Sequence, residues 1–222
     1  MSLLIQHAHV ISPDVDLPDA ALEIAGAKIK RVIPAGKALP ACSETYDAQG
    51  MRVVPGFIDT HCHGGMGHDV TSEDPAAMPI IAEAKLREGV TSMCPTTLTL
   101  SEEMLAKSLR NIEAYRRSPS HAKILGTHLE GPFINPECIG AQNPAYVRKP
   151  DMKEVLRLCE ISPVSLVTYA VEMAGSLELT EQLVAAGIMR GGEGLHASAR
   201  GRRVRFDAGG THTVTAGPFG PA

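Results

Sequence analysis

The sequence lacks three features that would each indicate a different class of protein. No stretch approaches the roughly twenty consecutive apolar residues that a membrane-spanning helix needs. Residues 1–14, MSLLIQHAHVISPD, have neither the basic start nor the small-residue cleavage site of a secretory signal. The 21 basic residues do not outnumber the 25 acidic ones, and a net charge of −4 gives no reason to expect nucleic acid as a partner. We therefore expect neither a membrane nor a nucleic acid as a partner.

The cysteines also lack the pattern of a disulfide framework. They are odd in number, widely scattered, and without a Cys-x-x-Cys pair: Cys42, Cys62, Cys94, Cys138 and Cys159. In a chain of 222 residues this usage favours reduced thiols and a cytoplasmic location. An apolar content of 44% and a charged content of 21% are ordinary for a globular protein with a substantial core.

Residues 1–52 contain short β-type runs that are separated by turn residues such as Pro, Asp and Gly. The expected strands are 3–11, 21–24, 28–33 and 51–54. A single small sheet is hard to stabilise alone, so we expect a β-sandwich-like domain that needs strands from elsewhere in the chain or a partner domain.

From Val53 to about residue 188, β-type runs alternate with helical patterns. The expected strands are 53–58, 89–94, 122–129 and 164–171, and the expected helices are 75–88, 101–117, 151–160 and 176–186. Ser101 is expected to cap the second helix, since Glu102 and Glu103 follow it in the first turn. Such alternation is typical of an α/β fold with a parallel sheet.

Metal-type residues at the ends of these strands favour a TIM-type barrel over the competing doubly wound sheet. A complete (β/α)₈ barrel takes about 250 residues, but only about 140 lie between Val53 and the last clear helix. The predicted fold is therefore α/β, a partial TIM-type (β/α) barrel comprising about its first half, with the small β domain before it.

Residues 189–222 are rich in Gly and Arg and show no convincing strand or helix period. They could be a flexible tail, or a degenerate, out-of-register segment in place of the fifth strand. The second interpretation is favoured, because half a barrel has a large apolar surface that a Gly/Arg tail cannot cover.

Two motifs carry the chemistry. VVPGFIDTHCHGG (residues 53–65) is an apolar run that ends in a His-x-His pair, and ILGTHLEGP (residues 124–132) is another that leads to Glu130. The period of two in a strand puts His61 and His63 on one face and turns Cys62 away into the packing. Two imidazoles and a carboxylate from a neighbouring strand suit Zn²⁺ or a similar divalent ion. The motifs thus indicate a metal-dependent hydrolase.

PGFIDTHCHGG and HLEGPFINPECIGAQNP together resemble the amidohydrolase superfamily and, within it, the N-acetylglucosamine-6-phosphate deacetylases. HLEGPFINP followed by a GAxNP element is characteristic of those enzymes, and VTYAVE (residues 167–172) is similar to their next strand. The resemblance covers residues 1–188, which suggests that the sequence is truncated or frameshifted after about residue 188.

The resemblance implies roles for individual residues. Glu130 matches the principal metal ligand, and His61 and His63 match a pair that many members use for a second metal position. Ala141 and Gln142 align with positions that contact the sugar, where many members carry His in place of Gln142. Gln142 can still offer an amide donor to a carbonyl or hydroxyl group, but it cannot supply a proton.

The later motifs of the family are matched only weakly. His196, in LHASA, faintly resembles a Gly-His-Ser/Thr motif and is a candidate ligand, whereas His212 matches a non-ligating position. Ala216 falls near the place of a ligating His, and the general acid/base aspartate of the family would lie beyond Ala222. His128 shares the strand face of Glu130, but a supporting or packing role is expected for it.

The implied reaction is hydrolysis of the N-acetyl amide of N-acetylglucosamine 6-phosphate, giving glucosamine 6-phosphate and acetate. The resemblance implies one or two divalent metal ions, Zn²⁺ above all, a small amino-sugar phosphate as the substrate, and a homodimer. The alternative is a truncated, catalytically inactive half-barrel that at most binds metal or a partner. A cyclic-amide hydrolase is a weaker alternative, against which HLEGP with GAQNP argues.

Overall fold

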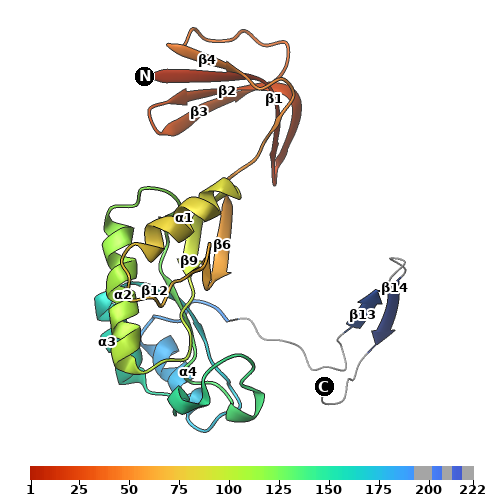
Figure 1. Cartoon of the computed structure of the whole chain (residues 1–222). Helices are drawn as coiled ribbons and strands as arrows, with labels where there is room; N and C mark the ends of the chain where they lie inside the picture. The colour runs from red at the N-terminus through yellow and green to blue at the C-terminus, as the bar shows by residue number, and fades with distance from the viewer. Residues whose placement is uncertain (193–201, 207–211, 217–222) are drawn as a thin grey trace.

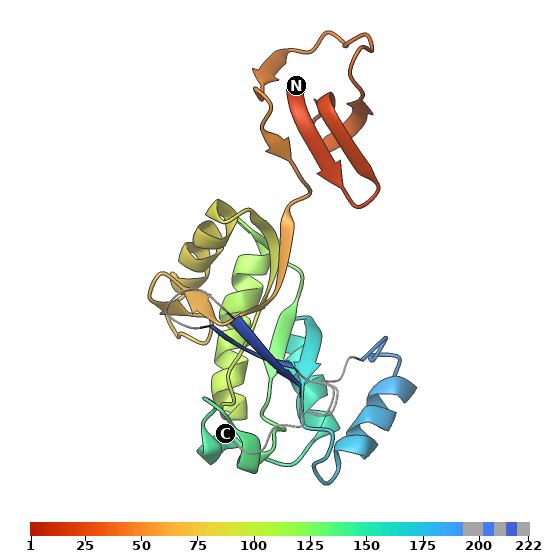
Figure 2. The same cartoon turned by 90° about the vertical axis from the view of Figure 1, so that its right-hand side faces the viewer.

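The structure is a computed structural model that describes residues 1–192, 202–206 and 212–216. An N-terminal β-sheet lies at one end of the molecule, and a larger region of helices and strands follows it (Figure 1). The view turned by 90° shows the same separation, with a short connecting segment between the two parts (Figure 2).

The N-terminal sheet has the strand order β3-β2-β1-β4, with β5 also paired to β1. Its strands are β1 (Ser2–Ser12), β2 (Val15–Ala25), β3 (Lys28–Ile33), β4 (Glu44–Asp47) and β5 (Arg52–Val53). The hairpins β1–β2 and β2–β3 are antiparallel, whereas β4 and β5 pair parallel to β1. The sequence did not predict β4, since all four of its residues are exposed and carry no apolar alternation.

The expected strand 53–58 does not exist as one element. Val53 ends β5 in the first sheet, and β6 (Phe57–Cys62) begins the second part of the chain. Pro55 has no N–H to donate to a ladder, and a Cβ on Gly56 would lie 2.2 Å from the Thr91 side chain. The apolar run is therefore divided between two sheets, and the prediction of a single strand is wrong.

Strands and helices alternate in the second part, as predicted. Its main strands are β6, β9 (Val90–Pro95), β10 (Lys123–Ile124), β11 (Thr127–Glu130) and β12 (Val164–Thr168), and its helices are α1 (Ala77–Arg87), α2 (Glu102–Arg117), α3 (Met152–Ile161) and α4 (Ser176–Ala185). The orders are β10-β9-β6 and β11-β12, all parallel, with a bridge between Thr96 and His128 linking the two groups. Short pieces complete the region: β7 (Gly64–Gly65), β8 (His68–Asp69), and the 3₁₀ turns η1 (Pro136–Cys138) and η2 (Pro144–Tyr146).

The expected strand 122–129 is interrupted. Gly126 has φ +159°, and a Cβ there would lie 2.0 Å from Ser165 Oγ. β10 before this glycine pairs with β9, whereas β11 after it pairs with β12. The glycine thus lets one run of sequence serve two neighbouring strands.

Helix α2 is the centre of the packing. Ser101 Oγ accepts the N–H of Met104 at 3.2 Å, which confirms the predicted cap. Leu105, Leu109 and Ile112, spaced at three and four residues, are fully buried. The first two contact Leu129 of β11 and Leu158 of α3, so this helix supports the strand that carries Glu130.

Glu113, also on α2, gives the fold a pH-dependent contribution. It accepts hydrogen bonds from Arg116 Nε at 2.6 Å and Arg117 Nε at 2.8 Å, and the Arg116 contact is the main reason that its pKa falls from 4.5 to about 2. Because the folded pKa is the lower one, the carboxylate stabilises the fold above pH 4.5 and loses this effect as the pH falls toward 2. Glu113→Gln should cost about 1–3 kcal/mol at pH 7 in urea unfolding and flatten the acid dependence.

Glu83→Gln is the matched control, since Glu83 pairs with Arg87 on the exposed surface of α1. Its cost should stay below about 1 kcal/mol. Equal losses in the two variants, or an unchanged acid dependence in Glu113→Gln, would contradict this role of Glu113.

Part of 189–222 forms an antiparallel hairpin, β13 (Arg202–Phe206) with β14 (His212–Ala216), to one side of the α/β region in Figure 1. No strand was predicted there. The β-branched residues of β14 explain the pairing in retrospect. His196 lies outside the described residues, so its suggested ligand role stays a prediction.

Across the part of the chain with described coordinates, no helix has the length and apolar character to cross a membrane.

Candidate metal site

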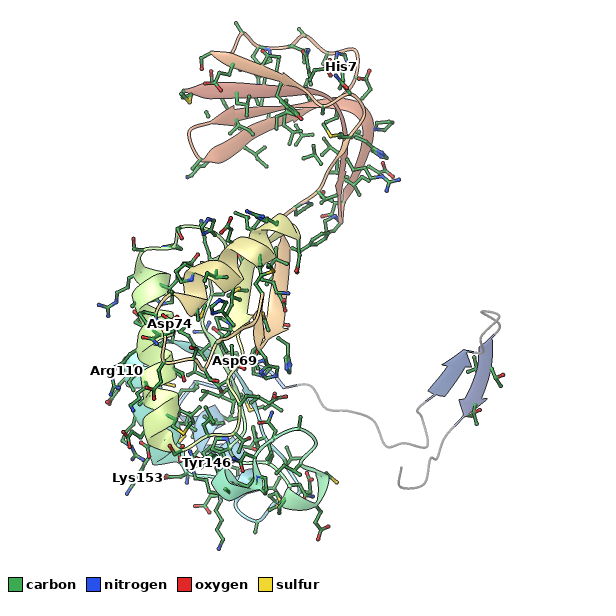
Figure 3. The ribbon with its side chains drawn as sticks, viewed as in Figure 1. His7, Asp69, Asp74, Arg110, Tyr146 and Lys153 are labelled. Atoms are coloured by element: carbon green, nitrogen blue, oxygen red, sulfur yellow. The ribbon has the colours of Figure 1, made fainter. Side chains whose placement is uncertain are left out.

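The candidate site lies where β6 and β11 end. His61 is the second-to-last residue of β6, His63 follows that strand directly, and Glu130 is the last residue of β11. Both strands belong to the parallel arrangement, so their carboxyl ends face the same edge. In Figure 3, Asp69 marks the end of β8, which follows His63, and Tyr146 marks the end of η2, which follows Glu130.

Three of the four predicted ligands converge, and the fourth, His196, lies outside the described residues. His61 Nε2 lies 3.0 Å from His63 Nε2, and Glu130 contributes Oε2 at 3.1 Å from His63 Nε2 and Oε1 at 3.7 Å from His61 Nε2. Four-coordinate Zn²⁺ with bonds of about 2.1 Å has ligands about 3.4 Å apart. The observed spacings bracket that value, so the donor atoms fit a small divalent ion. This is the one cluster of at least three metal-type side chains among the described residues.

A hydrogen bond of His63 determines which of its ring nitrogens is available to a metal ion. Its Nδ1 lies 3.1 Å from the carbonyl oxygen of Thr96, which can only accept, so Nδ1 carries the proton. In the neutral ring Nε2 then has its lone pair directed toward Glu130 and His61. A backbone partner of this kind fixes the orientation and tautomer of metal-binding histidines in general.

His128 is adjacent but already engaged. Its Nδ1 donates to the Thr60 carbonyl at 3.0 Å, and its Nε2 accepts from Thr168 Oγ1 at 2.7 Å. Burial lowers the pKa of this imidazole, partly offset by the Thr60 carbonyl. With both nitrogens satisfied, His128 fits the predicted supporting role.

Cys62 points away from the site. Its side chain is buried in the cluster that includes Met78, Ile81 and Met93, and burial raises the pKa of its thiol. Its backbone N–H donates to Thr96 Oγ1 at 2.9 Å, which ties the end of β6 to the end of β9. The predicted packing role is confirmed.

Gln142 reaches the site from the loop after β11, whereas Ala141 is exposed in that loop. The Gln142 amide donates to Glu130 Oε2 at 2.7 Å and accepts the Thr99 N–H at 2.7 Å. The family resemblance implied a sugar contact for Gln142 but nothing of these two bonds, because Thr99 is a backbone partner 43 residues away.

Gly131 lets the chain turn tightly after Glu130. It has φ +71°, and an added Cβ would lie 2.2 Å from Thr99 Oγ1, a buried atom. Gly131→Ala should therefore lose about 2–3 kcal/mol of stability in urea unfolding, combining backbone strain with a steric clash. Gly140→Ala, with φ +63° and open space around it, should show the backbone strain alone. Equal losses would show that the contact with Thr99 is unimportant.

The comparison with known proteins decides the family. A model described as "Amidohydrolase family" matches residues 52–187, more than half of the chain and both candidate ligand motifs. The chain belongs to the amidohydrolase family. Within it, the chain is 32% identical over 216 residues to the N-acetylgalactosamine-6-phosphate deacetylase of Escherichia coli O157:H7, and 38% identical over 152 residues to the N-acetylglucosamine-6-phosphate deacetylase of Mus musculus.

These matches cover 94% and 65% of this amidohydrolase chain but only 55% and 37% of the relatives. The chain thus spans about half the length, or less, of these two curated relatives. Among solved structures, N-acetylglucosamine-6-phosphate deacetylase from Pasteurella multocida superposes with a TM-score of 0.76 at 25% identity, covering 85% of this chain and 50% of that one. The enzyme from Mycobacterium smegmatis gives 0.71 at 31%, covering 84% and 52%.

Proposed function

We propose that this chain carries the metal-binding half of a deacetylase site that acts on N-acetylglucosamine 6-phosphate. The observation that carries the proposal is the convergence of His61, His63 and Glu130 at spacings that suit Zn²⁺. The family match and the names of the relatives support the reaction class. The products would be glucosamine 6-phosphate and acetate.

Each residue has a separate part in this proposal. Glu130 and the two histidines would hold the ion, and Ala141 and Gln142 would contact the sugar. When bound, Zn²⁺ would lower the pKa of a water molecule and polarise the amide carbonyl. Thr96 orients the His63 ring through its carbonyl, while His128 supports the end of β6 by bonding Thr60. His196 is a further candidate ligand.

The proposed architecture is the first half of a TIM-type barrel over residues 53–188, preceded by the β domain of residues 1–52. The parallel strands β6, β9, β11 and β12 support it. β6 and β11 end at the candidate ligands, and Thr96, directly after β9, accepts a hydrogen bond from His63 Nδ1. The superposition on about half of each deacetylase structure agrees with this arrangement.

The function is tested by incubating the purified chain with Zn²⁺ and N-acetylglucosamine 6-phosphate and measuring released acetate. A parallel reaction uses N-acetylgalactosamine 6-phosphate, since one relative carries that name. Acetate release that needs both Zn²⁺ and Glu130 supports the enzyme. Zinc binding without acetate release would instead support the inactive half-barrel.

A further inference from the structure

We propose that Gln142 is a positioning residue that fixes the Glu130 carboxylate for metal binding. This inference rests on the proposed metal site and adds to the sugar contact a second role for the same amide. Gln142 connects three segments through hydrogen bonds. It lies in the loop after β11, and it bonds both the segment that leads into α2 and the end of β11.

The two hydrogen bonds define the orientation of the Gln142 amide. Oε1 accepts the Thr99 N–H at 2.7 Å, and Nε2 donates to Glu130 Oε2 at 2.7 Å. A flipped amide would set two donors against each other at Thr99 and two acceptors against each other at Glu130. Only one orientation therefore satisfies both partners.

Thr99 anchors the Gln142 bridge, which is the pair of hydrogen bonds that links the Thr99 N–H through Gln142 to Glu130. Thr99 is fully buried, two positions before the cap of α2, and its side chain packs against Gly131. Its N–H can only donate, so it holds the Gln142 oxygen in place. The amide nitrogen is thereby presented to Glu130.

The bridge leaves the two oxygens of Glu130 in different states. Oε2 accepts from Gln142 and lies near His63, while Oε1 has no hydrogen-bond donor among the residues with described side chains. A carboxylate held by one oxygen has lost most of its rotational freedom before a metal ion arrives. Such supporting hydrogen bonds commonly determine metal affinity. One N–H of Gln142 stays available for a sugar carbonyl or hydroxyl group.

The test is calorimetric titration of the metal-free chain with Zn²⁺. Gln142→Met keeps the length of the side chain but removes both hydrogen bonds, and should weaken Zn²⁺ binding about 10–100-fold. Gln142→Ala, which also removes the side-chain bulk, should give a loss of similar size. Asn143→Ala is the matched control, because the Asn143 side chain bonds only the Ala145 N–H of its own turn among the described residues. Its Zn²⁺ affinity should equal that of the wild type.

The visible absorption spectrum of bound Co²⁺ adds a measurement that would not change if Gln142 had only a structural role. With saturating Co²⁺, the visible spectrum of Gln142→Met should differ from that of wild type, while Asn143→Ala should match it. If Glu130→Ala abolishes binding but Gln142→Met keeps both the affinity and the spectrum, the positioning role is wrong and the metal site stands. If the wild type binds no Zn²⁺, the positioning role and the proposed function are both wrong.

Discussion

Glu130→Ala is expected to weaken Zn²⁺ binding by at least about 100-fold, more than the loss of any supporting partner. Glu130 is the only carboxylate in the three-residue cluster and therefore supplies its only charged donor. Without it, two imidazoles remain, with ring nitrogens 3.0 Å apart. The measurement is calorimetric titration of the metal-free protein at constant pH.

The matched control is Glu137→Ala. Glu137 is an exposed acid in η1, in the loop that follows Glu130, and its side chain accepts no hydrogen bond from a described residue. Its removal changes the net charge equally and should leave Zn²⁺ affinity unchanged. A similar loss in both variants would mean that binding depends on overall charge and not on the proposed site.

Arg148→Met should destabilise the fold by about 3 kcal/mol, the lower end of the range for breaking a buried ion pair. Arg148 donates to both oxygens of Glu154, whose side chain is only 4% exposed, and to the carbonyls of Leu100 and Tyr146. It thus ties the Gln142 loop to α3 and to the segment before α2. The loss is measured by urea unfolding, and Zn²⁺ affinity should fall with it.

Arg157→Met provides the comparison, since Arg157 lies on the exposed side of α3. Arg157 bonds Glu102 through two nitrogens, but their side chains are 50% and 40% exposed. Screening by solvent should limit the cost to about 1 kcal/mol or less, with no effect on Zn²⁺ affinity. If Arg157→Met proved as damaging as Arg148→Met, burial of Glu154 would not be what makes the Arg148 pair important.

Features set by neighbouring residues could be predicted from the sequence. The cap at Ser101, the span of α2, and the opposite directions of His61 and Cys62 all depend on local periodicity or on local hydrogen bonds. The meeting of Glu130 with the His-x-His pair was also predictable, because parallel strands end at one edge.

Features set by distant contacts could not be predicted. The division of residues 53–58 between two sheets depends on how Gly56 packs against Thr91, and the break in 122–129 depends on Gly126 against Ser165. The bridge from Thr99 through Gln142 to Glu130 depends on a loop path that no periodicity encodes. Family resemblance identified Gln142, but only its contacts indicate a role toward the carboxylate.

The central claim is that His61, His63 and Glu130 bind one divalent ion together. Anomalous X-ray diffraction at the zinc edge, on crystals of the chain grown with Zn²⁺, tests it most directly. The account predicts an anomalous peak within bonding distance of both Nε2 atoms and the Glu130 carboxylate. No peak at this position, with zinc elsewhere or absent, would contradict it.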